Sequence, residues 1–295
     1  MPSLYTLLKA DEKQIRKILV KELKDNGYSP IVNPDFIYAK GTVPVMLVAH
    51  YDTVPEQPKY INNRNGILSA KKGLGADDRA GIYGILEIIK KHHCHVLFTG
   101  GEEVGGIGAR AFVNSKITPT PLNYLIQLDR RGENDAVYYD GDNSEFEDFI
   151  TGFGWKTAFG SFTDICELAP ALGVSAVNLS IGYQNEHTHK ETLDTQVMNT
   201  NIARVCKMLD GGFYEWKEAV YYYGNYSKYG GYFDGYYASY VVFYEDTDGN
   251  VFKTVTEGTS DAEAIGIFLM EHPDLCYNDI IDYMLEEDYD EKNYI

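Results

Sequence analysis

The chain has 295 residues, of which 44% are hydrophobic and 24% are charged, a composition typical of a folded globular protein rather than a disordered one. Its 44 acidic and 26 basic side chains give a formal net charge of −18, so repulsion from phosphates argues against nucleic acid as a partner. No apolar run reaches the length of about 18 residues that a membrane helix needs, so we expect no membrane contact.

The cysteines and the first residues predict a cytoplasmic protein. The four cysteines are scattered and form no Cys-x-x-Cys pair, which is typical of reduced thiols. The residues from Met1 to Leu4 lack a basic segment followed by an apolar stretch, so we expect no secretory signal.

The helices and strands expected in residues 1–212 alternate along the chain. In chain order, the apolar pattern predicts a helix over 11–26, a strand over 43–48, a helix over 78–91, a strand over 96–99, a helix over 108–114, strands over 124–128 and 136–139, a helix over 144–151, a strand over 174–181 and a helix over 194–209. This alternation predicts an α/β fold with a mostly parallel central sheet that helices cover on both faces.

The composition changes near residue 212, which predicts a boundary between two domains. Residues 1–212 carry 22 basic and 26 acidic side chains, net −4, whereas residues 213–295 carry 4 and 18, net −14. The second part opens with a tyrosine-rich stretch, from Phe213 to Tyr244, which we interpret as a connector. An alternative is that this stretch is a binding surface, because tyrosine supplies contact area at low entropic cost.

The rest of the second part predicts a small acidic α+β extension. Two β-prone segments, 240–244 and 251–255, flank an Asp-Gly turn and predict a hairpin. A capping box at 260–263 predicts a helix through residue 270, and a second helix is expected from Pro273, with apolar residues at 280, 281 and 284. This extension either covers a cleft or mediates oligomer formation.

Histidines and carboxylates stand at or just after the ends of the predicted strands. They fall in the segments His50-Tyr51-Asp52-Thr53-Val54-Pro55, Gly75-Ala76-Asp77-Asp78-Arg79-Ala80-Gly81, Gly101-Glu102-Glu103-Val104-Gly105, Gln127-Leu128-Asp129 and Glu186-His187-Thr188-His189-Lys190-Glu191. The carboxyl ends of parallel strands are where such sheets bind ligands. Imidazoles and carboxylates suit a pair of zinc ions about 3.5–4 Å apart, which needs one bridging carboxylate and separate ligands for each ion.

This ordered set of motifs resembles the co-catalytic zinc exopeptidases of the M20/M28 clan, the peptidase T-like and M28 aminopeptidase-like enzymes, over about residues 10–210. The resemblance implies that His50, Asp77 and Asp129 hold one zinc ion. Asp77 would bridge to a second ion, held by Glu103 and His187. Cobalt or manganese could replace zinc at such ligands.

The resemblance also implies a catalytic role for two further carboxylates. Glu102 would be the general base that takes a proton from metal-activated water. Asp52 would bind the second ring nitrogen of His50 and fix its tautomer. The implied activity is hydrolysis of peptide bonds in short peptides, by an aminopeptidase.

Two pairs of nearby residues, one of aspartates and one of histidines, need a choice, and the spacing of the family motifs makes it. The spacing selects Asp77 over Asp78, which then serves as a cap of the following helix. It selects His187 over His189, because the ligand stands four residues before an acidic residue, here Glu191.

The gaps between the motifs predict a bare catalytic domain. Only 27 positions separate His50 from Asp77, and 58 separate Asp129 from His187. These gaps leave no room for the lid or the inserted domain that some relatives carry.

Three more residues are candidates for contact with the substrate. Arg130 and Arg131 follow a proposed ligand and could hold a substrate carboxylate, or else be charges of a surface loop. Asp164, in Ser161-Phe162-Thr163-Asp164, resembles a Thr-Asp element near the site of related enzymes, which implies that it contacts the substrate or supports the site.

Two other functions stay open at this stage. One is a zinc amidohydrolase that deacylates a non-peptide amine, because the same ligands cleave any amide. The other is a non-catalytic adaptor built on the same domain, with the aromatic and acidic extension as its contact surface.

Overall fold

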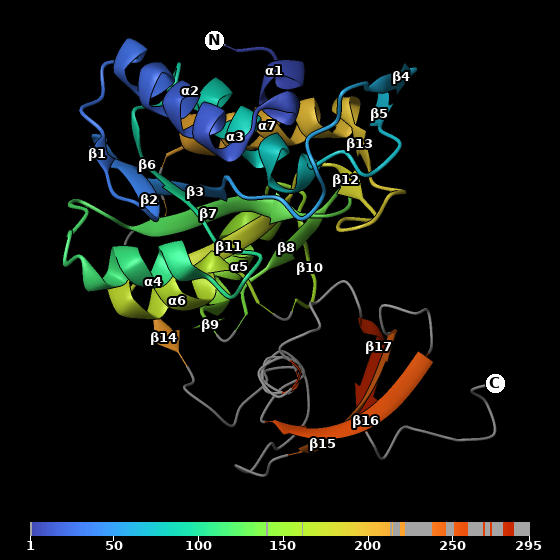
Figure 1. Cartoon of the computed structure of the whole chain (residues 1–295). Helices are drawn as coiled ribbons and strands as arrows, with labels where there is room; N and C mark the ends of the chain where they lie inside the picture. The colour runs from blue at the N-terminus through green and yellow to red at the C-terminus, as the bar shows by residue number, and fades with distance from the viewer. Residues whose placement is uncertain are drawn as a thin grey trace. The chain divides into compact units, whose positions relative to one another are not determined.

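The computed structural model in Figure 1 describes residues 2–139, 141–160, 162–212, 214, 219–221, 238–245, 251–258, 268, 272 and 280–285. Two compact units make up the chain, Met1–Tyr221 and Tyr222–Ile295. Every motif singled out above for its chemistry lies in the first unit.

The central feature of the first unit is a sheet of eight strands. Their order is β1 (Ile31–Val32), β2 (Phe36–Ala39), β6 (Cys94–Thr99), β3 (Val43–His50), β7 (Tyr124–Arg130), β11 (Ser175–Ser180), β8 (Asp135–Val137) and β10 (Lys156–Thr157). The four middle strands, β6, β3, β7 and β11, run parallel. Antiparallel pairs occur only toward the edges of this sheet, at β1–β2, β2–β6 and β11–β8, so the expected mostly parallel sheet is confirmed.

Helices cover both faces of this sheet, as expected (Figure 1). The helices of the first unit are α1 (Leu4–Lys9), α2 (Glu12–Asp25), α3 (Ala76–Ile88), α4 (Ile107–Asn114), α5 (Ser144–Thr151), α6 (Asp164–Leu172) and α7 (Thr195–Asp210). Helices α1, α2, α3 and α7 lie on one face, and α4 and α6 lie on the other.

The alternation of side chains along the strands explains the two covered faces. On β3, Val45 and Leu47 join the core beneath α3 and α7, whereas Met46 and Val48 join the core beneath α4 and α6. Every residue of β6 and the last six of β3 are buried, which is typical of parallel strands covered on both sides.

Local signals also explain where single helices begin and end. Helix α2 starts at a capping box in which Asp11 accepts the N–H of Gln14, and the Gln14 side chain accepts the N–H of Asp11. It ends before Gly27, whose φ of +86° is a backbone conformation that glycine adopts without strain.

A second sheet of four strands stands at the carboxyl ends of the central strands. Its order is β12 (Tyr183–Gln184), β13 (Thr192–Asp194), β5 (Ile67–Ser69) and β4 (Asn62–Arg64). The pairing of β13 with β5 brings residues 185–191 beside residues 70–77. A last short pair joins β9 (Gly141–Asp142) to β14 (Val220–Tyr221).

All the elements predicted in residues 1–212 are present, with boundaries shifted by a few residues. The pattern did not predict α1, α6 or the two- to four-residue strands at the sheet edges and in the small sheet. The 58 positions between Asp129 and His187 add β8, β10 and β11 to the central sheet, as expected of a domain without a lid.

The second unit contains an antiparallel sheet in the order β16 (Val251–Gly258), β15 (Ala238–Glu245) and β17 (Ile280–Leu285). The predicted hairpin is confirmed, because β15 and β16 pair from Ala238–Gly258 to Glu245–Val251. The helix predicted beyond Pro273 is wrong over Ile280–Leu285, which pairs with β15 as a strand. Apolar residues at 280, 281 and 284 fit helical spacing, but so short an apolar run also fits a strand.

Two other predictions for this unit lie almost wholly outside the described residues. They are the helix from 260 to 270, of which Phe268 alone is described, and the tyrosine-rich connector. In the described part of the chain, no helix combines the length and the hydropathy that a bilayer crossing requires.

Candidate active site

The five predicted ligands converge at the carboxyl edge of the central sheet. His50 is the last residue of β3, and Asp129 is the next-to-last residue of β7. Asp77 lies at the start of α3, Glu103 follows β6, and His187 lies in the loop between β12 and β13. Residues separated by up to 137 positions therefore share one small volume.

The first group of candidate ligands consists of His50, Asp77 and Asp129. Their ligand atoms all lie within 4.8 Å of one another. His50 Nε2 is 3.0 Å from Asp77 Oδ1 and 3.5 Å from Asp129 Oδ1. The His50 and Asp77 side chains are buried, and Asp129 is only 7% exposed.

The second group consists of Asp77, Glu103 and His187, and it shares Asp77 with the first. His187 Nε2 lies 3.1 Å from Asp77 Oδ2 and 2.9 Å from Glu103 Oε2. One oxygen of Asp77 thus faces each group, which is the geometry a bridging carboxylate requires. His187 has a φ of +60°, an uncommon conformation for a residue other than glycine, and such strain is often found at functional sites.

The donor set fits a pair of zinc ions. It offers imidazole nitrogens and carboxylate oxygens only, with one shared carboxylate. Glu103 Oε1 is buried and has no hydrogen-bond partner among the described residues, a costly state for a carboxylate unless a cation satisfies it.

Asp77 is positioned by Glu191, a buried carboxylate. Glu191 accepts four backbone N–H groups, from Leu74 at 2.8 Å, Gly75 at 2.7 Å, Ala76 at 2.7 Å and Asp77 at 3.1 Å. This places a negative charge at the N-terminus of α3, where the helix dipole favours it. The loop that carries His187 and the loop that carries Asp77 are therefore held by one side chain.

Close packing fixes the start of α3 against β7. A Cβ atom at Gly81 would lie 2.1 Å from the carbonyl oxygen of Leu128, so this position admits only glycine. Asp78 is fully buried, and its Oδ1 accepts the N–H of Gly81 at 3.0 Å, as a helix cap does. His189 is exposed and belongs to neither group of candidate ligands.

Asp129 is held by donors that the sequence did not reveal. Tyr183 Oη donates to Asp129 Oδ1 at 3.1 Å, while Thr163 Oγ1 and Gln127 Nε2 donate to Oδ2 at 2.8 and 3.0 Å. Asn178 bonds both the N–H and the carbonyl of Asp129. These bonds leave the carboxylate little freedom to turn away from His50.

The two predicted catalytic carboxylates lie beside these groups. Glu102 Oε2 is 4.0 Å from His50 Nε2, and the side chain is 12% exposed. Asp52 Oδ1 is 3.5 Å from His50 Nδ1, which also lies 3.2 Å from the Asp52 carbonyl oxygen. The Asp52 carboxylate accepts the N–H groups of Glu102 and Glu103, so it also positions the turn that carries them.

The mutual contacts shift the pKa values of the site. Although burial opposes the change, the imidazoles of His187 and His50 hold the pKa of Asp77 below its usual range. Burial raises the pKa of Glu102 well above its usual value, and burial together with the charge of Asp77 raises the pKa of Glu103 to about 7. Against the effect of burial, Asp77 and Glu103 raise the pKa of His187 to about 11.

A pocket of about 160 Å³ opens over the two groups. The residues that line it are Asp77, Glu102, Asp129, Arg130, Arg131, Tyr139, Gly160, Phe162, Asn178, Tyr183, Glu186 and His187. Both predicted arginines line the pocket, but each already has a hydrogen-bond partner. Arg130 donates to the Phe159 carbonyl at 3.0 Å, and Arg131 donates to Glu186 Oε1 at 2.9 Å.

Asp164 does not line this pocket. It is fully buried at the start of α6 and accepts the hydroxyl of Thr99, the last residue of β6. Burial raises its pKa to about 7. Of the two predicted roles, this placement favours support of the site over contact with a substrate.

Tyr139, Phe162, Asn178 and Tyr183 are pocket residues that sequence reasoning missed. Asn178 could have been found from the expectation that ligands bind at the carboxyl ends of parallel strands, because it lies near the carboxyl end of a buried strand. The others lie in loops or in a two-residue strand and carried no signal.

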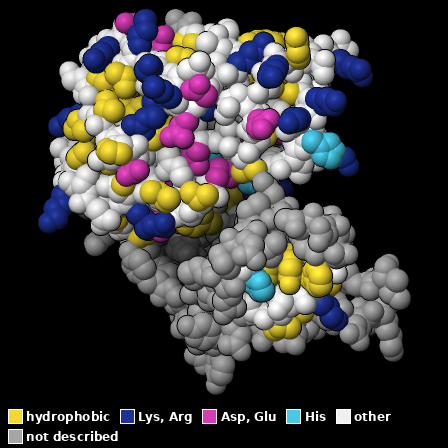
Figure 2. Space-filling model, in the orientation of Figure 1, with side chains coloured by type: hydrophobic (Ala, Val, Ile, Leu, Met, Phe, Trp, Pro, Cys, Tyr) yellow, Lys and Arg dark blue, Asp and Glu magenta, His cyan; other side chains and the backbone are white. Residues whose placement is uncertain are grey.

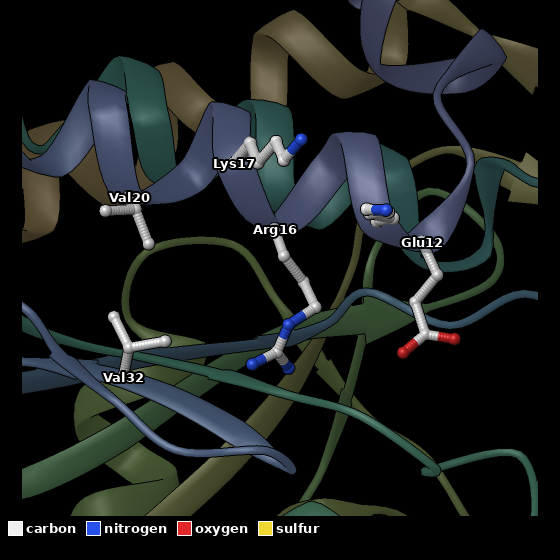
Figure 3. Close-up of a pocket in the computed structure, with 6 residues that line it drawn as sticks. Glu12, Arg16, Lys17, Val20 and Val32 are labelled. Atoms are coloured by element: carbon white, nitrogen blue, oxygen red, sulfur yellow. The ribbon is translucent and has the colours of Figure 1, made fainter.

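A larger hollow of about 720 Å³ lies against α2, away from the candidate ligands. Figure 3 shows Val20 of α2 and Val32 of β1 facing one another across it. Arg16, which also lines the hollow, binds the carbonyls of Asn33 and Pro34 and the hydroxyl of Tyr51. These bonds give Arg16 a structural role, and the hollow holds none of the predicted site residues.

Figure 2 shows how charge is distributed on one face of the first unit. Acidic side chains gather near the middle of this face, and Lys and Arg side chains lie mainly around its margin. Such a distribution favours cations at the centre.

A sequence profile of peptidase family M28 matches residues 39–207, a range that includes all five candidate ligands and Glu102. The chain belongs to peptidase family M28. This is a family of metallopeptidases that typically depend on zinc. The resemblance inferred from the motifs is thus confirmed at the level of the M28 family.

One curated relative of this M28 family member is a probable carboxypeptidase of Aspergillus niger. It is 31% identical over 111 residues, which make up 34% of this chain and 27% of the relative. The match therefore spans about a quarter of the length of that relative.

Solved structures of peptidases share the fold of this M28 family member. The aminopeptidase PepT of Bacillus cereus superposes with a TM-score of 0.57 at 16% identity, covering 70% of this chain and 96% of that chain. The TET1 peptidase of Pyrococcus horikoshii, described as assembling into a tetrahedron or a large octahedral shell, gives a TM-score of 0.54 at 15% identity, covering 70% and 99%. At these identities the likeness concerns the fold alone, and it confirms the expected fold class.

Proposed function

We propose that this protein is a two-zinc aminopeptidase that removes residues from the free N-terminus of short peptides. The observation that carries the proposal is the pair of ligand groups that share Asp77, with Glu102 in the same pocket. Residues 1–212 form the catalytic domain in this proposal. Family membership supports a metallopeptidase, and the aminopeptidase activity and the count of two ions are our inference.

Glu102 and Asp52 have different roles in the proposed hydrolysis. Bound zinc ions supply Lewis-acid chemistry and lower the pKa of water to about 7. Glu102 takes the proton of the attacking water and delivers it to the leaving amine. Asp52 fixes the ring of His50 by contact with Nδ1, so that Nε2 faces Asp77 and Asp129.

The small volume of the pocket supports an exopeptidase. Pockets for drug-sized ligands measure about 300–1,000 Å³, whereas this one measures about 160 Å³. Such a pocket suits a single residue at the end of a chain better than the middle of a long peptide.

The Glu102→Gln variant tests the proposal. It keeps the size of the side chain and all five ligands, so we expect about two zinc ions per chain by metal analysis and a loss of peptidase activity of at least about 100-fold. The substrates are short peptides with free N-termini, assayed with chelator and with added zinc. The matched control is Glu133→Gln, an exposed residue outside the pocket, which should leave the activity unchanged.

Two results would contradict the proposal. Full activity of the Glu102→Gln variant would refute the role of the base, and activity that survives chelation would refute the role of the metal. A preference for peptides blocked at the N-terminus would favour a carboxypeptidase or a deacylase.

A further inference from the structure

Apolar side chains are exposed to solvent on the turn that follows Glu102 and Glu103. Val104 is 69% exposed, and Ile107, the first residue of α4, is 44% exposed. The half-buried side chain of Phe162 lines the pocket itself. We call Val104, Ile107 and Phe162 the apolar rim. A single exposed apolar residue is ordinary, whereas a group of them beside a pocket is typical of a binding surface.

Backbone contacts hold the apolar rim next to Glu102. The carbonyl of Glu102 accepts the N–H of Gly105 at 2.9 Å and that of Gly106 at 3.1 Å, so the turn folds back onto this residue. A Cβ atom at Gly106 would lie 2.9 Å from Cζ of Phe162, which means that the phenyl ring rests on the same turn. The apolar rim therefore borders the pocket on the side of Glu102.

The proposed reaction determines which part of a peptide meets the apolar rim. Glu102 delivers a proton to the leaving amine, so the nitrogen of the second residue comes within hydrogen-bond distance of this carboxylate. The pocket of about 160 Å³ suits one residue, which leaves the second residue outside it. The side chain of the second residue branches from the carbon next to that nitrogen, and so it starts close to Glu102 and the apolar rim.

The chemistry of the apolar rim selects an apolar side chain. Valine, isoleucine and phenylalanine offer neither charge nor a strong hydrogen-bonding group, so the favourable term is the burial of apolar area. A large apolar side chain buries far more area than the hydrogen of a glycine does. A charged side chain would lose hydration there without gaining a partner from the apolar rim.

We propose that the apolar rim binds the side chain of the second substrate residue, so that the enzyme prefers short peptides in which a large apolar residue follows the bond that is cut. This inference rests on the proposed function and deepens it by naming the substrate class. Phe162 and Val104 are then residues that determine specificity.

Two dipeptides that differ only in the second residue test the preference. For the wild type, we expect kcat/KM for leucyl-phenylalanine to exceed that for leucyl-glycine about 10-fold or more. The Val104→Ser variant should lower this ratio about threefold, and Phe162→Ala should lower it to about 2. The matched control is Val32→Ser, because Val32 is also an exposed valine, 54% exposed, and lies outside the pocket, so the ratio should stay as in the wild type.

Val104→Ser is the decisive variant, because substitution of so exposed a side chain has little effect on the fold. Phe162 directly precedes Thr163, which donates to Asp129, so its replacement could also disturb the metal site. Zinc content is therefore measured for every variant, and it should not change in Val104→Ser.

A second pair of dipeptides separates the second residue from the first. Phenylalanyl-glycine and alanyl-glycine differ only in the first residue, so Val104→Ser should leave the ratio of their kcat/KM values unchanged. If the effect of Val104→Ser appears in this pair rather than in the leucyl pair, the assignment to the second residue is refuted. Equal kcat/KM values for the two leucyl dipeptides in the wild type would also refute the inference.

Binding without turnover distinguishes this inference from the proposed function. If the wild type cleaves no peptide, the proposed function fails, and calorimetric titration of both leucyl dipeptides into Glu102→Gln protein still tests the apolar rim. Tighter binding of leucyl-phenylalanine that Val104→Ser weakens, and Val32→Ser does not, supports the inference. Equal binding of the two dipeptides contradicts it.

Discussion

A specific prediction concerns Glu191, because this one buried side chain accepts four backbone N–H groups of the segment that leads into α3. The perturbation is Glu191→Gln, which keeps the shape but replaces one carboxylate oxygen by an amide NH₂. That NH₂ group then faces two N–H donors, either those of Leu74 and Gly75 or those of Ala76 and Asp77. Two hydrogen bonds are lost in either orientation.

The expected decrease in the free energy of unfolding follows from the loss of these two hydrogen bonds. A hydrogen bond to a charged group contributes about 1.5–3 kcal/mol, so two of them give about 3–6 kcal/mol. Burial raises the pKa of Glu191, which means that removing its charge recovers part of this loss. We expect a net decrease in the free energy of unfolding of about 2–4 kcal/mol. Because Asp77 belongs to both ligand groups, zinc affinity should fall about 10- to 100-fold.

Urea unfolding followed by far-ultraviolet circular dichroism measures the stability, and competition with a chromophoric chelator measures the zinc affinity. Glu133→Gln is the control, since it makes the same chemical change at an exposed residue of the same unit. Our reasoning is refuted if Glu191→Gln unfolds within about 0.5 kcal/mol of the wild type, as a surface substitution does, and binds zinc with unchanged affinity.

Two further predictions follow from the pKa shifts. Asp77 and Glu103 raise the pKa of His187 to about 11, so at pH 7 the metal-free protein keeps a proton there that zinc must displace. Zinc binding should therefore release protons and weaken as the pH falls. Calorimetry in buffers of different ionisation enthalpy measures the protons released, and a value of zero would contradict the prediction. Burial raises the pKa of Cys94 to about 12, so iodoacetamide at pH 8 should label Cys94 only after unfolding, and rapid labelling of the native protein would contradict this placement.

The positions of His50 and Asp129 could be predicted from strand ends, whereas the full set of five ligands was implied by the resemblance to a known family. His50 and Asp129 lie at the ends of β3 and β7, two strands whose apolar runs are visible in the sequence. Parallel strands bring such residues to one edge of the sheet, so the pattern places them together without knowledge of the contacts. Within this site, the spacing of the family motif selected Asp77 over Asp78, which agrees with the contacts of both.

The supporting contacts could not be predicted, because they join residues without any local signal. Tyr183 lies in a two-residue strand, and its hydroxyl reaches Asp129 across 54 positions. Glu191 reaches the 74–77 segment across more than 110 positions. Arg131 could be predicted as a pocket residue, but nothing in the sequence indicated that Glu186 would already bind it.

The two ligand groups differ in a way that explains why the substrate pocket lies where it does. In the first group, His50 is buried and Asp129 is fixed by several donors, so these side chains cannot rearrange around a substrate. In the second group, His187 is 36% exposed on a strained loop and stands beside Glu186. Members of both groups line the pocket, and His187 is the most exposed of the five candidate ligands, so we expect a substrate to approach from the side of His187.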